Sequence, residues 1–403
     1  MRALRTWRDG HADRRSAQFP YEVVTRHVQR SGKHHLSAQV IEQLVDARRD
    51  LAAQDDLLTR FLDCLLDKHD GTYRYDTYLS LPVLRDLVTG PAAVLSPMEL
   101  AGLLVADVLR FEVEALHGRH DLLPDGRPSV RTVRKRIRHG LGHLYRHGTP
   151  SPTRRDWNPE QPEQADEILA ALPSSGVPLV RARLAMTVHP VHVLHDEYMF
   201  IRILQSYETV FTGLVGSAAE ALHRLRAADV AGAAGCLADA ATALERAGLL
   251  FTLLATMDPS AFRHFRDFTE GASAIQSEYY KRFELTCGTP PGERLSSPAF
   301  GSVPVVLEEA RHGRDTITRA YLDIRRSNPE MLPALDTALA RLERAHQRWK
   351  STHHSLATRM LGDASGSGYT AGVPYLKDCL DNRLFWGIGT DLTTAEVRHA
   401  DLT

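Results

Sequence analysis

The sequence has 403 residues, 43% hydrophobic and 25% charged, with 49 Lys and Arg against 50 Asp and Glu. This composition excludes an intrinsically disordered chain, and the near-zero net charge excludes binding of nucleic acid through a global basic field. The four cysteines form no Cys-x-x-Cys pair, which is typical of a reduced, intracellular chain. There is no secretory signal and no apolar run of about 20 residues. We therefore expect a cytoplasmic protein that binds neither membrane nor nucleic acid.

Helical periodicity dominates the sequence and alternating β-branched runs are rare, so the predicted fold class is mainly α. In the first 70 residues, the apolar positions from Leu36 to Leu66 fit an amphipathic helix. The aromatic segment from Tyr73 to Pro82 is predicted to be an ordered loop that leads into a helix. Proline suits the first turn of a helix, which places Pro82 there.

Residues from about 119 to 190 are the least regular part of the sequence. They contain a basic run from Arg131 to Arg138 and a proline-rich segment from Thr149 to Pro162, which breaks any helix. We interpret the basic run as the solvated face of a helix, because no aromatic residues interleave with its charges as base stacking would require. Binding of RNA or of an acidic partner is the alternative.

Two long helices follow, separated by a Gly/Ala-rich helix predicted at Asp229–Leu254. The first covers His195–Leu214, where Phe200, Leu204, Tyr207, Phe211 and Leu214 form one apolar stripe. The second carries a seam at steps of three and four, formed by Leu339, Leu342, His346, Trp349, His353, Leu356 and Met360, and ends at Leu361-Gly362 before a glycine-rich loop, Gly366–Gly372. A buried imidazole needs a partner, because an unpaired buried polar group costs about 1–3 kcal/mol.

The residues alone leave two metal-binding hypotheses open. A di-iron carboxylate bundle needs Glu-x-x-His pairs, and the chain offers Glu114/His117, Glu220/His223, Glu343/His346 and Glu396/His399, a pattern that also arises by chance. The other hypothesis is a heme held by one seam histidine. His353 fits it, because heme has a large flat apolar face and takes a neutral imidazole as its axial ligand. The glycine loop lacks the spacing and the preceding strand of a dinucleotide fingerprint.

Four separated segments resemble the tryptophan 2,3-dioxygenase family and its heme-dependent aromatic oxygenase relatives. They are Tyr75-Asp-Thr-Tyr78-Leu; His195-Asp-Glu-Tyr-Met-Phe200-Ile-Arg-Ile-Leu204-Gln-Ser-Tyr207-Glu; Phe262-x-x-Phe265-Arg266 with Ala272-Ser273-x-x-Gln276-Ser277; and Trp349-Lys-Ser-Thr-His353 with Arg359-Met360-Leu361-Gly362, Gly366-Ser367-Gly368 and Gly372-x-x-Tyr375-Leu376. The resemblance covers most of residues 71–90 and 192–390. It implies a helical bundle with a heme pocket in residues 71–403, with residues 1–70 as a helical extension and residues 90–190 as an insertion.

The resemblance also implies a role for each matching residue. His353 is expected to be the proximal ligand of heme b, Arg266 to bind the substrate carboxylate, and Ser367 to meet the substrate ammonium. Phe200 and Phe262 would line the pocket of an aromatic ring, and Tyr75 and Tyr78 would close it, with Tyr75 supplied by a neighbouring subunit of a homo-oligomer (a tetramer or dimer). Leu204 stands where tryptophan dioxygenases have a distal histidine that accepts the indole N–H, and leucine accepts no hydrogen bond. No residue is assigned as a general acid or base.

The expected function is heme-dependent addition of O2 across the indole C2–C3 bond of L-tryptophan or a modified tryptophan. The product is of the N-formylkynurenine type, and the setting is a specialised biosynthetic pathway. One alternative is a heme monooxygenase or peroxygenase that hydroxylates an aromatic amino acid. Another is a non-catalytic heme-binding sensor, against which the carboxylate-binding Arg266 argues, because sensing a gas needs no such group.

Overall fold

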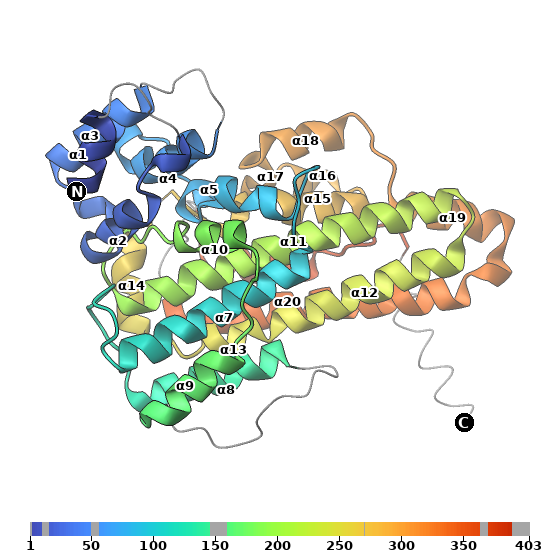
Figure 1. Cartoon of the computed structure of the whole chain (residues 1–403). Helices are drawn as coiled ribbons and strands as arrows, with labels where there is room; N and C mark the ends of the chain where they lie inside the picture. The colour runs from blue at the N-terminus through green and yellow to red at the C-terminus, as the bar shows by residue number, and fades with distance from the viewer. Residues whose placement is uncertain are drawn as a thin grey trace. The chain divides into compact units, whose positions relative to one another are not determined.

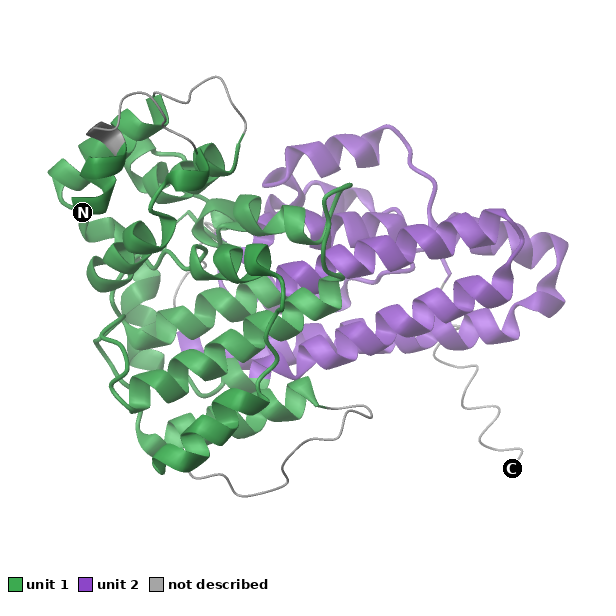
Figure 2. Cartoon of the chain, in the orientation of Figure 1, with its two compact units in different colours: residues 1–206, 252–273 green, residues 207–251, 274–403 purple. Residues whose placement is uncertain are grey.

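The computed structural model describes residues 2–9, 16–49, 56–145, 159–269, 271–362 and 370–388. Across these ranges every regular element is a helix and no strand occurs, which confirms the mainly α class (Figure 1). The chain divides into two compact units, residues 1–206 with 252–273 and residues 207–251 with 274–403 (Figure 2). Helix α11 (His195–Arg226) contributes residues to both units.

The first unit contains the N-terminal helices and the predicted insertion. Its helices are α1 (Arg2–Asp9), α2 (Tyr21–Ser31), α3 (Ala38–Arg49), α4 (Leu57–Asp70), α5 (Tyr75–Tyr78), α6 (Leu81–Leu84), α7 (Pro97–Leu116), α8 (Val130–Leu144), α9 (Pro162–Ala171), α10 (Pro178–Ala185) and α14 (Pro259–Asp267), with part of α13 (Leu250–Leu254). The helices of the second unit are α12 (Val230–Gly248), α15 (Glu278–Cys287), α16 (Gly292–Leu295), α17 (Pro298–Gly301), α18 (Pro304–Arg311), α19 (Ile317–Ser327), α20 (Pro333–Leu361) and α21 (Val373–Asp378).

The stretch from Leu36 to Leu66 forms two helices, α3 and α4, rather than one. Helix α4 begins where the Asp56 side chain accepts a hydrogen bond from the Thr59 backbone N–H at 2.9 Å. An N-cap of this kind begins a new helix, and the spacing of apolar residues alone does not predict it. Both helices place their apolar faces in a shared core with α1 and α2.

The N-terminal helices are also hydrogen-bonded to the segment that precedes α11. The Lys33 backbone N–H donates to the carbonyl oxygen of Pro190 at 2.8 Å, and the Gln29 amide donates to that of Val188 at 3.2 Å. Gly32 lies so close to the backbone of this segment that a Cβ would be 2.7 Å from the carbonyl oxygen of Val191. Its φ of +73° also favours glycine. The Lys33 ammonium is itself buried in an ion pair with Asp67 at 2.8 Å.

The aromatic segment from Tyr73 to Pro82 forms two short helices, α5 and α6, where an ordered loop leading into a helix was expected. Pro82 lies in the first turn of α6, as predicted. Ser80, which precedes α6, has a left-handed backbone (φ 50°), and its hydroxyl lies 2.9 Å from Nδ1 of His189.

The basic run lies on α8, whose apolar residues pack against α7 and α9. Most of its arginines are exposed or half-buried, as expected of a solvated face. Arg136 is the exception, because it is only 1% exposed and pairs with two carboxylates. The interpretation of the whole run as solvated was therefore wrong at this position.

Two glycines of α8 provide a matched test of its packing against α7. A Cβ on Gly140 would lie 2.6 Å from the side chain of fully buried Leu109, whereas a Cβ on Gly142 would meet nothing within 4 Å. We expect Gly140→Ala to lower the free energy of unfolding by about 1–3 kcal/mol through overpacking. Gly142→Ala should raise it by about 0.5–1 kcal/mol, because alanine favours the helix. Urea denaturation measures both, and equal effects would contradict close packing at Gly140.

In the second unit, helices α12 and α20 run side by side (Figure 1). The predicted helix at Asp229–Leu254 is divided into α12, capped by Asp229, and α13. On the α20 seam Leu339, Leu342, His346 and Met360 are buried, and the helix ends at Leu361 before Gly362, as predicted. In the described ranges, no single helix is both long and apolar enough to cross a membrane; one bent combination, Val230–Leu254 with Pro259–Asp267, meets the length and composition criteria.

Candidate functional site

Helix α14 of the first unit carries Phe262 and Arg266. Its start is fixed by Asp258, whose Oδ1 accepts hydrogen bonds from the backbone N–H groups of Ser260 at 2.8 Å and Ala261 at 2.9 Å. Phe262 and Arg266 are four residues apart and therefore share one face of the helix. Arg266 is half-buried, and this burial lowers the pKa of its guanidinium. The helix thus presents a cation and an aromatic ring on the same side.

Three phenylalanines from α11 and α14 form an aromatic cluster beside this face. The Phe200 ring lies 5.5 Å from Phe262 and 5.3 Å from Phe265, and the last two are 5.5 Å apart. Phe200 and Phe262 were predicted to line one pocket, and the structure places them in contact. Phe265, which contacts both rings, is fully buried.

Tyr75, Tyr78, Phe200 and Leu204 belong to a single hydrophobic cluster of the first unit. Tyr75 and Tyr78 are 3% and 2% exposed, and Leu204 is half-buried. Tyr75 packs among residues of its own chain, and its contribution to the site of a neighbouring subunit stays a prediction. One chain therefore brings these four predicted residues together.

Glu197 is a buried carboxylate of this region that the sequence analysis missed. It accepts hydrogen bonds from the Tyr78 hydroxyl at 3.2 Å and from the backbone N–H groups of Val191 at 2.6 Å and His192 at 3.0 Å. Burial raises the pKa of Glu197 to about 8, although these three donors oppose the shift. The available signal was a carboxylate in the first turn of a helix, followed directly by Tyr198, Met199 and Phe200. Its contacts fix the orientation of Tyr78.

His353 lies on α20 in the second unit, on an aromatic surface. Its ring stacks on Phe251 at a centroid distance of 5.7 Å and an interplanar angle of 13°, and it lies 5.6 Å from Trp349. The side chain is half-buried, and burial lowers the pKa of His353 to about 4. Its imidazole is therefore neutral at physiological pH, which is the form that coordinates a metal. No described residue forms a hydrogen bond with it.

Two buried donors near His353 are also without partners in the described part of the chain. They are the Tyr207 hydroxyl and the Trp349 indole Nε1, whose rings are 5.9 Å apart. Buried donors are normally paired, so each needs an explanation. An acceptor group from outside the polypeptide would satisfy this need.

His346, the other seam histidine, has a structural role. It is fully buried and its Nε2 lies 2.7 Å from the Tyr280 hydroxyl, with Glu343 on its other side. The ranges that the structure describes contain no group of three or more His, Cys, Asp and Glu residues placed to hold a metal ion. The described Glu-x-x-His pairs therefore give the di-iron hypothesis no support, and the pair Glu396/His399 lies outside the described residues.

Ser367 and most of the Gly366–Gly372 loop lie outside the described residues, so the predicted ammonium contact stays a prediction. The other predicted residues fall into two sets. The first unit holds Tyr75, Tyr78, Phe200, Leu204, Phe262 and Arg266, and the second unit holds His353.

Comparison with known proteins gives a consistent result. The chain is 25% identical over 245 residues to a tryptophan 2,3-dioxygenase of Burkholderia multivorans, which covers 51% of this chain and 78% of that protein. It is 26% identical to the tryptophan 2,3-dioxygenases of Anaeromyxobacter sp. over 219 residues, and of Polaromonas sp. over 242, each alignment covering 82% of the relative. No family model matches the chain.

A helical chain with these relatives is an oxidoreductase. It is similar to tryptophan 2,3-dioxygenases at low identity, over about half of its length.

Proposed function

We propose that this chain binds heme b through His353 and adds O2 across the indole C2–C3 bond of L-tryptophan or a modified tryptophan. The product is then of the N-formylkynurenine type. One observation carries the proposal: a neutral, half-buried imidazole lies on an aromatic surface with no hydrogen-bond partner among the described residues. The relatives' names give the reaction class.

The residues of the second unit fit a heme, which His353 would hold. Phe251 and Trp349 offer flat apolar contact beside His353, and the unpaired donors of Tyr207 and Trp349 suit the acceptor oxygens of such a group. A ferrous heme, when bound, supplies the activation of O2. The protein's own contribution is to hold the ligand imidazole neutral and to keep water from this surface.

The residues of the first unit supply substrate recognition. Arg266 binds the carboxylate of the amino acid, a role that suits a planar guanidinium. Phe200 and Phe262 contact the aromatic ring, while Tyr75 and Tyr78 enclose it, and Ser367 accepts a hydrogen bond from the ammonium. Binding and orientation are the tasks of these side chains, because none is placed as a general acid or base.

Leu204 favours a second candidate function. A leucine side chain cannot accept the indole N–H, so selectivity for unmodified indole is weakened at this position. Hydroxylation of another aromatic amino acid, with insertion of one oxygen atom, is the reaction that this change favours. A specialised biosynthetic setting, a cytoplasmic location and a homo-oligomeric assembly complete the proposal.

Product mass separates the two candidates. Reduced, heme-loaded protein is incubated with ¹⁸O2 and either L-tryptophan, 1-methyl-L-tryptophan or L-tyrosine, and the products are analysed by mass spectrometry. The dioxygenase predicts incorporation of two labelled atoms into an indole substrate, whereas a monooxygenase predicts one. If no substrate gains oxygen although heme is bound, both proposals are wrong and the sensor alternative is favoured.

Substitution of Leu204 tests recognition of the ring nitrogen. Leu204→His should raise kcat/KM for L-tryptophan relative to 1-methyl-L-tryptophan by about threefold to tenfold, because a neutral hydrogen bond contributes about 1 kcal/mol. Leu204→Met, which conserves volume and apolarity, is the control and should leave this ratio unchanged. A ratio that is the same in all three proteins would show that position 204 does not contact the indole nitrogen.

A further inference from the structure

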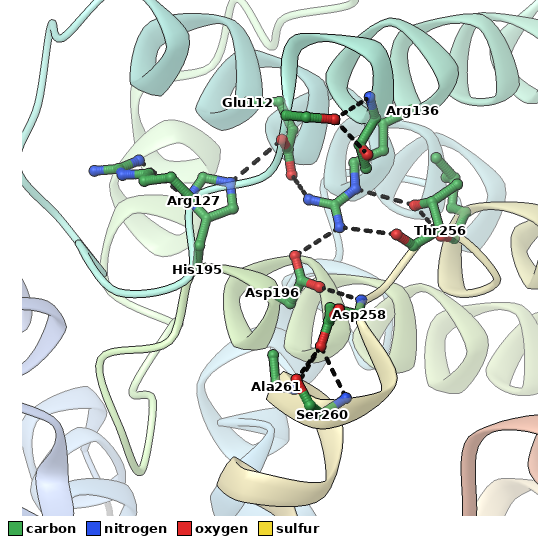
Figure 3. Close-up of polar contacts among 12 residues, drawn as sticks. Glu112, Arg127, Arg136, His195, Asp196, Thr256, Asp258, Ser260 and Ala261 are labelled. Carbon is green, nitrogen blue, oxygen red and sulfur yellow. Dashed lines mark hydrogen bonds and ion pairs between the residues drawn. The ribbon is translucent and has the colours of Figure 1, made fainter.

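Arg136 of α8 lies at the centre of a buried polar network in the first unit (Figure 3). Its guanidinium pairs with Glu112 of α7 at 2.7 Å and with Asp196 of α11 at 2.6 Å. Its Nε donates to the Thr256 hydroxyl at 3.0 Å. One side chain from the segment at 90–190 therefore contacts both α11 and the loop before α14.

The network continues from Asp196 to the start of α14. Oδ1 of Asp196 accepts from Arg136, and Oδ2 accepts from the backbone N–H of Asp258 at 2.9 Å. Asp258 then caps α14 through Ser260 and Ala261 (Figure 3). An unbroken series of hydrogen bonds thus runs from Arg136 to the helix that carries Arg266.

Glu112, the second carboxylate paired with Arg136, is ionised. Its second oxygen lies 3.3 Å from His195 Nε2, and Arg127 donates to His195 Nδ1 at 3.0 Å. Burial opposes ionisation, but the nearby Arg136 and His195 outweigh it and lower the pKa of Glu112 to about 2. Arg136 is therefore held by two carboxylates, and it cannot relax its position without leaving a buried charge unpaired.

We infer that the segment at 90–190 positions the substrate-binding helix α14 through Arg136 and Asp196. The inference rests on the carboxylate-binding role proposed for Arg266. Eight residues separate Asp258 from Arg266, which is about 12 Å along a helix. A change at the cap therefore moves the guanidinium, and a displacement of about 1 Å in such a group lowers rates on the order of 100-fold. Arg136 and Asp196 are positioning residues, because neither touches substrate in this scheme.

The test compares ligands with and without a carboxylate. In Asp196 each carboxylate oxygen accepts from a different donor, and Asp196→Asn replaces one of these oxygens by an NH2 group, so either Arg136 or the Asp258 N–H loses its acceptor there. Isothermal titration calorimetry should show at least tenfold weaker binding of L-tryptophan, whereas the affinity for tryptamine, which lacks the carboxylate, should change less than twofold. Arg134→Gln is the control, because Arg134 is on the same helix but half exposed. It should leave both affinities unchanged.

Two results would overturn the inference. Equal losses for both ligands would mean that the network only stabilises the fold, and unchanged affinities would mean that α14 does not depend on it. Thr256→Val removes one acceptor of Arg136 and should weaken binding of L-tryptophan about threefold, with little change for tryptamine. This variant provides the test if Asp196→Asn fails to fold.

Hydrogen exchange separates failure of this inference from failure of the proposed function. Arg266→Gln should weaken binding of L-tryptophan but not of tryptamine. If both affinities change equally or neither changes, the role proposed for Arg266 is wrong. The positioning role of the network is then tested separately by the exchange rates of the amide protons of residues 260–267. In Asp196→Asn or Thr256→Val they should exchange at least fivefold faster than in the unmodified protein, while those of α4 should not change. Unaltered exchange in α14 would refute the positioning role.

Discussion

Replacement of His353 by alanine is expected to abolish heme binding while leaving the helical fold intact. The side chain is half-buried and accepts no hydrogen bond from the described residues, so its loss removes a ligand without opening a buried polar network. The Soret absorbance and the iron content of purified protein measure retention, and circular dichroism measures the fold. His354→Ala, at the adjacent half-buried position, is the control and should keep its heme.

Full heme occupancy in the His353→Ala protein would contradict the ligand assignment. Loss of heme from His354→Ala as well would point to a general disturbance of α20. His346→Ala is unsuitable as a control, since it removes the buried contact with Tyr280 and is expected to destabilise the second unit.

Replacement of Arg266 by alanine should weaken binding of L-tryptophan by about 2–5 kcal/mol, the usual cost of truncating one partner of a charge-assisted pair. Heme retention should be unaffected, because the proposed ligand of the heme is His353 and not Arg266. Titration calorimetry measures the affinity, with tryptamine as the ligand that lacks the carboxylate. Arg263→Ala, an exposed position of the same helix, is the matched control. An unchanged affinity for L-tryptophan would exclude Arg266 from the substrate site.

Periodicity and caps in the sequence predict much of this fold. The helical class, the first turn at Pro82 and the end of α20 at Leu361-Gly362 follow from local rules. The division into α3 and α4 does not follow from apolar spacing, because the apolar pattern continues across the break while the cap at Asp56 starts a new helix. Local sequence patterns therefore predict where helices lie better than where one helix ends and the next begins.

Long-range pairing limits what the sequence reveals about polar residues. Arg136 resembles its exposed neighbours in the basic run, and its partners Glu112 and Asp196 are 24 and 60 positions away. Glu197 was missed for a related reason, since its donors come from a different helix and from the loop before its own. The aromatic residues around Phe200 were found because the resemblance named them individually.

The contacts of the N-terminal helices with residues 188–191 have a practical consequence for anyone designing a shorter version of this protein. Carbonyl oxygens of Val188, Pro190 and Val191 receive their hydrogen bonds from Gln29, Lys33 and His34, and Gly32 fits directly against this backbone. A chain trimmed to begin at residue 71 would lose every one of these donors just ahead of α11. We therefore expect a fragment that begins at residue 71 to be less stable than the full chain, because these buried carbonyl oxygens would be left without donors.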